Sequence, residues 1–204
     1  MNLEKMKRLL SVLVSLVLVV GMMPEMSMTA MAAEPVEYIN YTYNNNGITG
    51  RTVNACETYT TVSSGTTTWE NGWYVVNSNV TISSRVTASG TVHLILCDGC
   101  TLNAVKGINV ATGNSLTIYA QSEDPATMGV LNSRTSDDKS GTAGIGGNDG
   151  KAAGTIVFNG GKITAQGSTD RNGAGGGAAF GGGRGASNND IKSAVEALRK
   201  QSKS

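Results

Sequence analysis

The chain is poor in aromatic, charged and proline residues. Only 5% of its 204 residues are aromatic and 15% are charged, and it has three prolines, three cysteines and one histidine. Between residues 40 and 185 Leu, Glu and Lys are also scarce, and no segment there carries the apolar stripe of an amphipathic helix. Thr, Val and Ile are frequent instead, so we expect an all-β protein.

The N-terminus has the pattern of a secretory signal peptide. Three basic residues among the first eight precede an apolar block, 9–23, and the small residues Ala30 and Ala32 follow it. The block is shorter than the ~20 residues that span a bilayer. We therefore expect residues 1–32 to be cleaved off, which leaves a secreted or cell-surface chain without a membrane contact.

The chain that remains after cleavage has no excess charge. Removing residues 1–32 takes away three of 16 Lys and Arg residues and two of 15 Asp and Glu residues, which leaves 13 of each. Because nucleic-acid binding needs an excess of Lys and Arg, nucleic acid is not expected as a partner. The 172 residues left fit one domain, and no second apolar segment or wall-anchoring signal follows.

Short β-branched runs separated by Asn, Asp, Gly or Ser indicate a series of short strands with turns between them. The expected strands are 80–83, 92–96, 101–104, 107–110, 116–120, 129–132, 155–158 and 162–165.

An internal repeat relates these strands. Residues 94–104, "LILCDGCTLNA", align without gaps to residues 155–165, "TIVFNGGKITA", and 114–121 supplies another strand opening. The offset of 61 residues is close to three steps of about 20, a period that is typical of a solenoid. We expect inward aliphatic columns, with Asn, Asp and Gly at the corners. The solenoid would span 67–186, after an N-terminal extension or cap at 33–66.

The repeats also resemble a known family. The segments "WENGWYVVNSNVTISSRV" (69–86), "VHLILCDGCTLNAVKGINVATGNSLTIYAQ" (92–121) and "AGIGGNDGKAAGTIVFNGGKITAQG" (143–167) are similar to repeats in surface proteins of anaerobic Gram-positive bacteria, notably gut clostridia. The resemblance implies a right-handed parallel β-helix of carbohydrate-binding or adhesin-like type. The chain departs from this family in its short length, its lack of a wall anchor and its C-terminal tail.

The tail, 187–204, differs from the rest in composition. Ile191, Ala194, Val195 and Leu198 recur at spacings of three and four, which predicts an amphipathic helix. The helix would cover the end of the solenoid, where strand edges are otherwise unpaired. Alternatively, the tail ends a truncated gene in which further repeats once continued.

The glycine-rich segments 143–167 and 173–185 fail the pattern of a phosphate-binding loop. That loop needs Gly-Lys followed by Ser or Thr, but Ile163 follows Lys162 and Ala152 follows Lys151. We therefore interpret the glycines as corners between stacked strands.

Calcium is the one cofactor that the residues suggest. Asp137, Asp138 and Asp149 lie beside glycine in polar loops, and hard oxygen ligands suit Ca²⁺. The alternative is that all three are solvated loop residues. No other cofactor is expected.

The cysteines are odd in number. Cys97 and Cys100, in "CDGC", are candidates for a small disulfide across a turn, which leaves Cys56 without an intramolecular partner. Redox and metal-binding roles fit less well, because no βαβ pattern and no second ligand pair are present.

Aromatic residues offer a candidate carbohydrate site. Trp69, Trp73 and Tyr74 lie within six residues, and their rings could stack on sugar faces. The alternative is that the tryptophans plug the N-terminal end of the solenoid and cover its first rung.

Taken together, these patterns predict a non-enzymatic, exported β-helix module for adhesion or extracellular polysaccharide binding, through exposed Asn, Thr and aromatic side chains along the solenoid. The partner would be an extracellular polysaccharide or a host or cell-wall glycan. One alternative is a structural spacer or truncated fragment. Another is a lyase or hydrolase of pectin-like polysaccharide, which would need clustered acids. Asp98, Asp149 and Asp170 are isolated in the sequence, and His93 has no recognisable Asp or Ser partner.

Overall fold

Short β-strands make up all of the regular structure in the described part of the chain. The computed structural model describes residues 34–44, 47–135, 140–169 and 176–186, and the backbone of 191–193. No helix occurs in these residues, which confirms the all-β prediction. The described residues therefore contain no helix that could span a membrane.

Most strands belong to three parallel sheets. The six-stranded sheet contains β3 (Thr60–Thr61), β5 (Gly72–Val76), β8 (Thr91–Leu96), β11 (Ser115–Ala120), β14 (Thr155–Phe158) and β17 (Ile191–Ser193). The five-stranded sheet contains β4 (Thr68–Trp69), β7 (Val86–Ala88), β10 (Ile108–Val110), β13 (Ile145–Gly146) and β16 (Phe180–Gly181). The four-stranded sheet contains β6 (Val80–Ile82), β9 (Thr101–Ala104), β12 (Val130–Arg134) and β15 (Lys162–Gln166).

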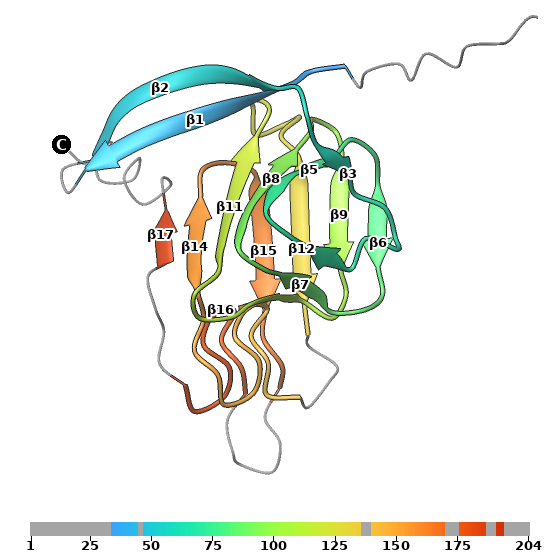
Figure 1. The fold of residues 1–204 in the computed structure, drawn as a ribbon, viewed down its shortest axis with the longest axis vertical. Coiled ribbons are helices and arrows are strands. Elements are labelled where there is room, and N and C mark those ends of the chain that lie inside the picture. Colours follow the sequence, from blue (N-terminus) through green and yellow to red (C-terminus); the bar gives the residue numbers. More distant parts are fainter. Residues whose placement is uncertain (1–33, 45–46, 136–139, 170–175, 187–190, 194–204) are drawn as a thin grey trace, which may run out of the picture. The chain divides into compact units, whose positions relative to one another are not determined.

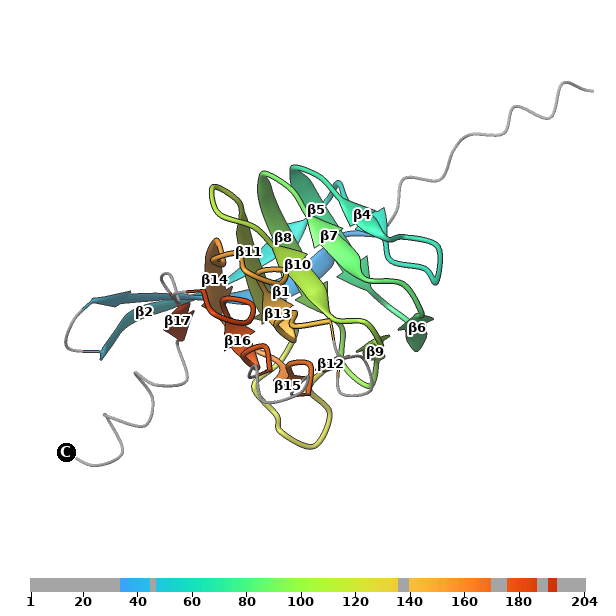
Figure 2. The ribbon, with the colours of Figure 1, turned by 90° about the horizontal axis from the view of Figure 1, so that it is seen from below.

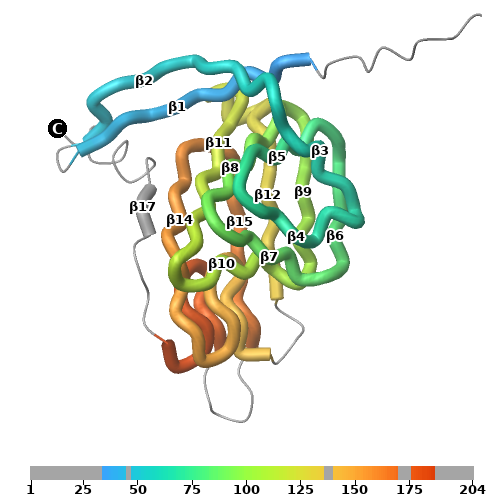
Figure 3. The backbone as a smooth tube through the Cα atoms, viewed as in Figure 1, coloured from blue at the N-terminus to red at the C-terminus, as the bar shows by residue number. Residues whose placement is uncertain are grey.

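The chain visits the three sheets in a fixed order. One circuit runs through β4, β5 and β6, and the next runs through β7, β8 and β9 beside it (Figures 1 and 3). In Figure 2 the five-stranded sheet is seen as a series from β4 to β16. A parallel pair needs a crossover of a dozen or more residues. Here the rest of the circuit is that crossover, so no helix is required.

Inward side chains stack in columns across the circuits, as predicted. On β8, Val92, Leu94 and Leu96 face inward and are fully buried. Strand pairing places Leu94 between Tyr74 and Ile118 in one column. The turns between strands hold the expected glycines: Gly99 adopts a left-handed backbone angle, φ 71°, that a side chain rarely tolerates.

The register corrects the repeat alignment in one of its two strands. Leu102 and Ile163 both pair with Leu131, as the gapless alignment requires. In the preceding strand, however, Leu94 shares its column with Phe158 instead of Thr155, a shift of three residues. The turn between the two strands therefore has a different length in the two circuits, which an alignment without gaps does not represent.

The circuits also lengthen along the chain. Gly72 pairs with Val92, Thr91 with Ser115 and Ser115 with Thr155, so the step grows from 20 to 24 and then to 40 residues. The two aligned segments consequently lie two circuits apart, and the predicted three steps of equal length are wrong. In Figure 3 the loops of the later circuits, in orange and red, extend beyond the earlier ones.

The predicted N-terminal extension forms a long antiparallel hairpin of β1 (Val36–Asn44) and β2 (Gly47–Cys56), followed by β3. The hairpin packs against outward side chains of the six-stranded sheet, and Figure 1 shows it crossing the upper ends of β11, β8 and β5. Beneath it, the outward side chains Val75, Ile95 and Tyr119 are 0%, 0% and 7% exposed. The hairpin is thus a cover for an apolar strip that would otherwise face water.

Polar contacts hold the far half of the hairpin. The Asn159 amide donates to Asn40 Oδ1 at 2.7 Å, and its oxygen accepts from the backbone N–H of Tyr41 at 3.2 Å. The Glu123 carboxylate accepts from the Tyr41 hydroxyl and from Arg51 Nε, the latter at 3.0 Å. These two donors lower the pKa of Glu123. The contacts anchor the hairpin to loops that follow β11 and β14.

The predicted C-terminal helix is wrong at the residues that the structure describes there. Ile191, Lys192 and Ser193 form β17, which pairs in parallel with β14. The free edge of β14 offers backbone hydrogen bonds that outweigh the helical pattern of the side chains. The other residues of 187–204 lie outside the described part of the chain, as do residues 1–32.

We expect Leu94→Ala to lower the free energy of unfolding by about 2–5 kcal/mol, because it leaves a cavity in a fully buried column. The matched control is Val105→Ala, at a 47% exposed aliphatic position, which should change it by less than about 0.5 kcal/mol. Urea denaturation followed by circular dichroism gives both values. Similar effects at the two positions would contradict the column.

Candidate functional site

The three aromatic residues expected to bind sugar lie on different faces. Trp69 is fully buried, stacks on Tyr74 at 5.6 Å and donates its indole N–H to Thr66 O at 3.0 Å. Trp73 precedes Tyr74 on β5 and therefore points outward. The three rings do not form the shared platform that the sequence predicts. Trp69 and Tyr74 instead pack inside the first circuit. For Trp69, this agrees with the alternative prediction that the tryptophans cover the first rung of the solenoid.

Trp73 belongs to an aromatic cluster between the sheet and the hairpin. Its ring stacks on His93 at 4.3 Å with an interplanar angle of 18°, and it lies 4.8 Å from Tyr38 and 5.4 Å from Tyr119. A hydrogen bond of 3.2 Å joins His93 Nδ1 to the Tyr119 hydroxyl. Burial lowers the pKa of His93 and raises that of Tyr119 to about 12. Because Tyr38 of β1 packs on the rings of Trp73 and Tyr119, the cluster joins the hairpin to the six-stranded sheet.

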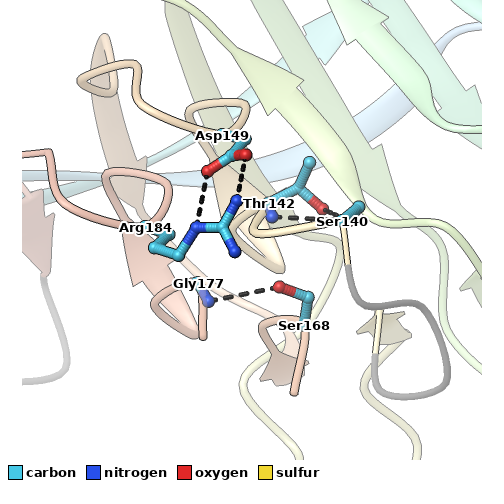
Figure 4. Close-up of polar contacts among 6 residues, drawn as sticks. All are labelled: Ser140, Thr142, Asp149, Ser168, Gly177 and Arg184. Carbon is cyan, nitrogen blue, oxygen red and sulfur yellow. Dashed lines mark hydrogen bonds and ion pairs between the residues drawn. The ribbon is translucent and has the colours of Figure 1, made fainter. Parts of the chain in front are cut away.

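The candidate calcium ligand Asp149 is held by an arginine. Arg184 Nε donates to Asp149 Oδ1 at 3.0 Å, and Arg184 Nη2 contacts the other carboxylate oxygen (Figure 4). A cation would have to displace this bidentate guanidinium. Asp137 and Asp138 lie outside the described residues, and the residues that are described contain no cluster of three or more His, Cys, Asp or Glu side chains suited to a metal.

The glycine-rich loops stack backbone on backbone around this ion pair. A Cβ atom on Gly146 would lie 2.0 Å from Gly181 O, and one on Gly183 would lie 1.9 Å from Asn148 O. Side chains are therefore excluded by the neighbouring circuit. Figure 4 shows related polar contacts, including the Gly177 N–H that donates to Ser168 Oγ at 3.2 Å. The glycines thus allow the loops of neighbouring circuits to stack closely, in addition to forming the turns that the sequence predicts.

Arg85 binds the inner glycine-rich loop through its carbonyl groups. The guanidinium donates at 2.8–3.4 Å to the backbone oxygens of Lys106, Ala143, Gly146 and Gly147 and to Asn148 Oδ1. A phosphate loop presents N–H groups to an anion. This loop presents oxygens to a cation, which is the opposite polarity. Arg85 was not predicted from the sequence, because its partners in the glycine-rich loop lie 58 to 63 residues away.

The three cysteines are free thiols in the structure. The predicted disulfide between Cys97 and Cys100 is not formed; the turn is closed by the Cys100 N–H, which donates to Cys97 O at 3.2 Å. Burial raises the pKa of Cys97 to about 11 and also raises that of Cys56. Cys56 and Cys97 are buried in the apolar cluster beneath the hairpin, and a thiol with a raised pKa is a poor nucleophile.

A row of polar side chains crosses the outer face of the four-stranded sheet. Strand pairing aligns Thr81, Asn103, Asn132 and Thr164, and we call them the Thr/Asn row. Asn132 Nδ2 donates to Asn103 Oδ1 at 3.0 Å, and Asn103 Nδ2 donates to Thr81 Oγ1 at 3.4 Å. Adjacent strands lie about 4.8 Å apart, so hydrogen-bonding groups repeat at that interval.

The sequence predicts exposed Asn and Thr side chains along the solenoid as a binding surface, but it did not single out the members of the Thr/Asn row. A signal was present, because the repeat alignment places Asn103 opposite Thr164. The middle member, Asn132, falls in a circuit that the alignment skipped. The row has hydrogen-bond donors and acceptors but no titratable group, so it can bind a ligand and has no acid or base for catalysis.

Comparison with known proteins adds no relative: no family model, curated protein or solved structure matches the chain.

We expect Arg85→Ala to lower the free energy of unfolding by about 2 kcal/mol, because several carbonyl groups lose a charged donor. Hydrogen exchange of the amides in 143–148 should speed up. Arg85→Lys should not restore protection, since an ammonium lacks the planar fork. The control is Lys151→Ala, an exposed position. Unchanged exchange in Arg85→Ala would contradict this role.

Proposed function

We propose that this chain is an exported, non-catalytic module of right-handed parallel β-helix architecture that binds extracellular polysaccharide. Three parallel sheets visited in a fixed order support the architecture. The hand follows from the general preference of parallel crossovers, about 98% of which are right-handed. The proposed export depends on the leader at 1–32, which lies outside the described residues.

The Thr/Asn row is the observation that supports polysaccharide binding. Hydroxyl and amide groups at strand spacing on an open sheet face offer repeated hydrogen bonds. A linear glycan carries hydroxyl groups along its whole length. An extended chain laid across the strands can therefore meet several members of the row at once, and many weak contacts then add up.

The partners of the Asp98 and Asp149 carboxylates support a binding function over a catalytic one. The Asp98 carboxylate accepts a hydrogen bond from Ser122 Oγ at 2.9 Å, and Asp149 is paired with Arg184. A glycosidase needs two carboxyl groups on either side of the scissile bond, one of them ready to give a proton. Both acids instead have local structural partners. Asp170 lies outside the described residues.

We expect the chain to be retained on an insoluble polysaccharide, and the double variant Asn103→Ala, Asn132→Ala to lose most of that retention. The physical reason is the loss of two neighbouring amides from the centre of the row. Asn77→Ala, at an exposed turn outside the row, is the matched control and should bind like the native chain.

Retention would be measured by pull-down across a panel of plant, fungal and bacterial wall polysaccharides. Circular dichroism would check that each variant folds. No retention on any polysaccharide would contradict the proposal and favour a structural spacer, in which the amides serve only to hydrogen-bond one another. Equal retention of the double variant would exclude the Thr/Asn row as the site.

A further inference from the structure

The four-stranded sheet is positively charged. Its strands β6, β9, β12 and β15 contain no Asp or Glu, but they contain Arg134 and Lys162. Both cations are exposed. The chain as a whole carries almost equal numbers of acidic and basic residues, so this sheet departs from the average.

Strand geometry places the two cations on either side of the Thr/Asn row. Lys162 precedes Thr164 by two residues on β15, and Arg134 follows Asn132 by two residues on β12. Residues two apart in a strand point to the same face. The outward face therefore has Lys162 in one column, the Thr/Asn row in the next and Arg134 in the third. At about 3.3 Å per residue, the outer columns are about 13 Å apart.

Neither cation is in an ion pair with another described residue. Among the described residues, the ion pairs join Arg51 to Glu123 and Arg184 to Asp149, and neither involves this sheet. A guanidinium binds carboxylate in a bidentate manner, and an ammonium binds it as a point charge. Hydrogen-bonding groups flanked by two cations suit a chain that carries both hydroxyl groups and anionic groups.

On the basis of the polysaccharide function proposed above, we propose that the glycan is acidic, with Arg134 and Lys162 binding its carboxylate groups beside the Thr/Asn row. The row supplies contacts to the sugar hydroxyls, which acidic and neutral glycans share. The two cations supply the preference for the acidic form.

The test compares polygalacturonate with the same polymer in its fully methyl-esterified form, which removes the charge and keeps the backbone. We expect the chain to bind the acid about tenfold more tightly near 0.1 M salt. The difference should shrink near 1 M salt, where the Debye length falls to about 3 Å. The double variant Arg134→Ala, Lys162→Ala should bind both polymers alike, and Lys151→Ala should behave as the native chain.

Each outcome separates the two proposals. Equal binding of both polymers by the native chain would overturn the acidic preference and leave polysaccharide binding intact. Binding of neither polymer, nor of any other glycan, would overturn polysaccharide binding itself. Equally tight binding of an RNA homopolymer would also overturn the inference, because it would reveal a cationic surface without selectivity for sugar. Thermal unfolding of each variant confirms that its fold is retained.

Discussion

Parallel backbone pairing between successive circuits is the interaction on which the rest of this molecule depends. Each strand bonds to the strand one circuit earlier, so residues far apart in the sequence fall into straight columns. Inward columns make the aliphatic core, and outward columns make the surface. The same register that pairs Leu102 with Leu131 in the core aligns Asn103 with Asn132 on the outer face of the same sheet. Core and candidate site are thus two consequences of one pairing.

The same constraint explains how the longer circuits are held. Their glycine-rich loops approach so closely that a Cβ on Gly146 or Gly183 would overlap a neighbouring carbonyl. A backbone without side chains has little apolar surface to bury, and glycine loses much entropy on ordering. Charged hydrogen bonds compensate: Arg85 binds the carbonyl groups of the inner loop, and Arg184 joins the outer loop to Asp149. Arginine side chains thus add charged hydrogen bonds where the circuits widen, beside the buried Ile145 and Ala153.

The sequence was sufficient for eight of the strands but not for the others or for how the strands pair. All eight predicted strands are present, because alternation and turn residues are local signals. Register is not local, since it depends on turn lengths, and the shift of Leu94 to Phe158 shows the error that follows. The packing of the hairpin over Val75 and Ile95 was missed because this contact joins residues far apart in the sequence. The helical spacing at Ile191 was misleading, because the free edge of β14 binds that segment as a strand.

Cross-linking tests the register of the outer face most directly. With the native cysteines replaced by alanine, Asn103→Cys and Asn132→Cys lie on paired positions of adjacent strands, about 4.8 Å apart, within disulfide reach. Asn103→Cys and Arg134→Cys lie two residues out of register and beyond about 7 Å. We expect a disulfide in the first pair under mild oxidation and none in the second. The reverse pattern, or no disulfide in either pair, would contradict it.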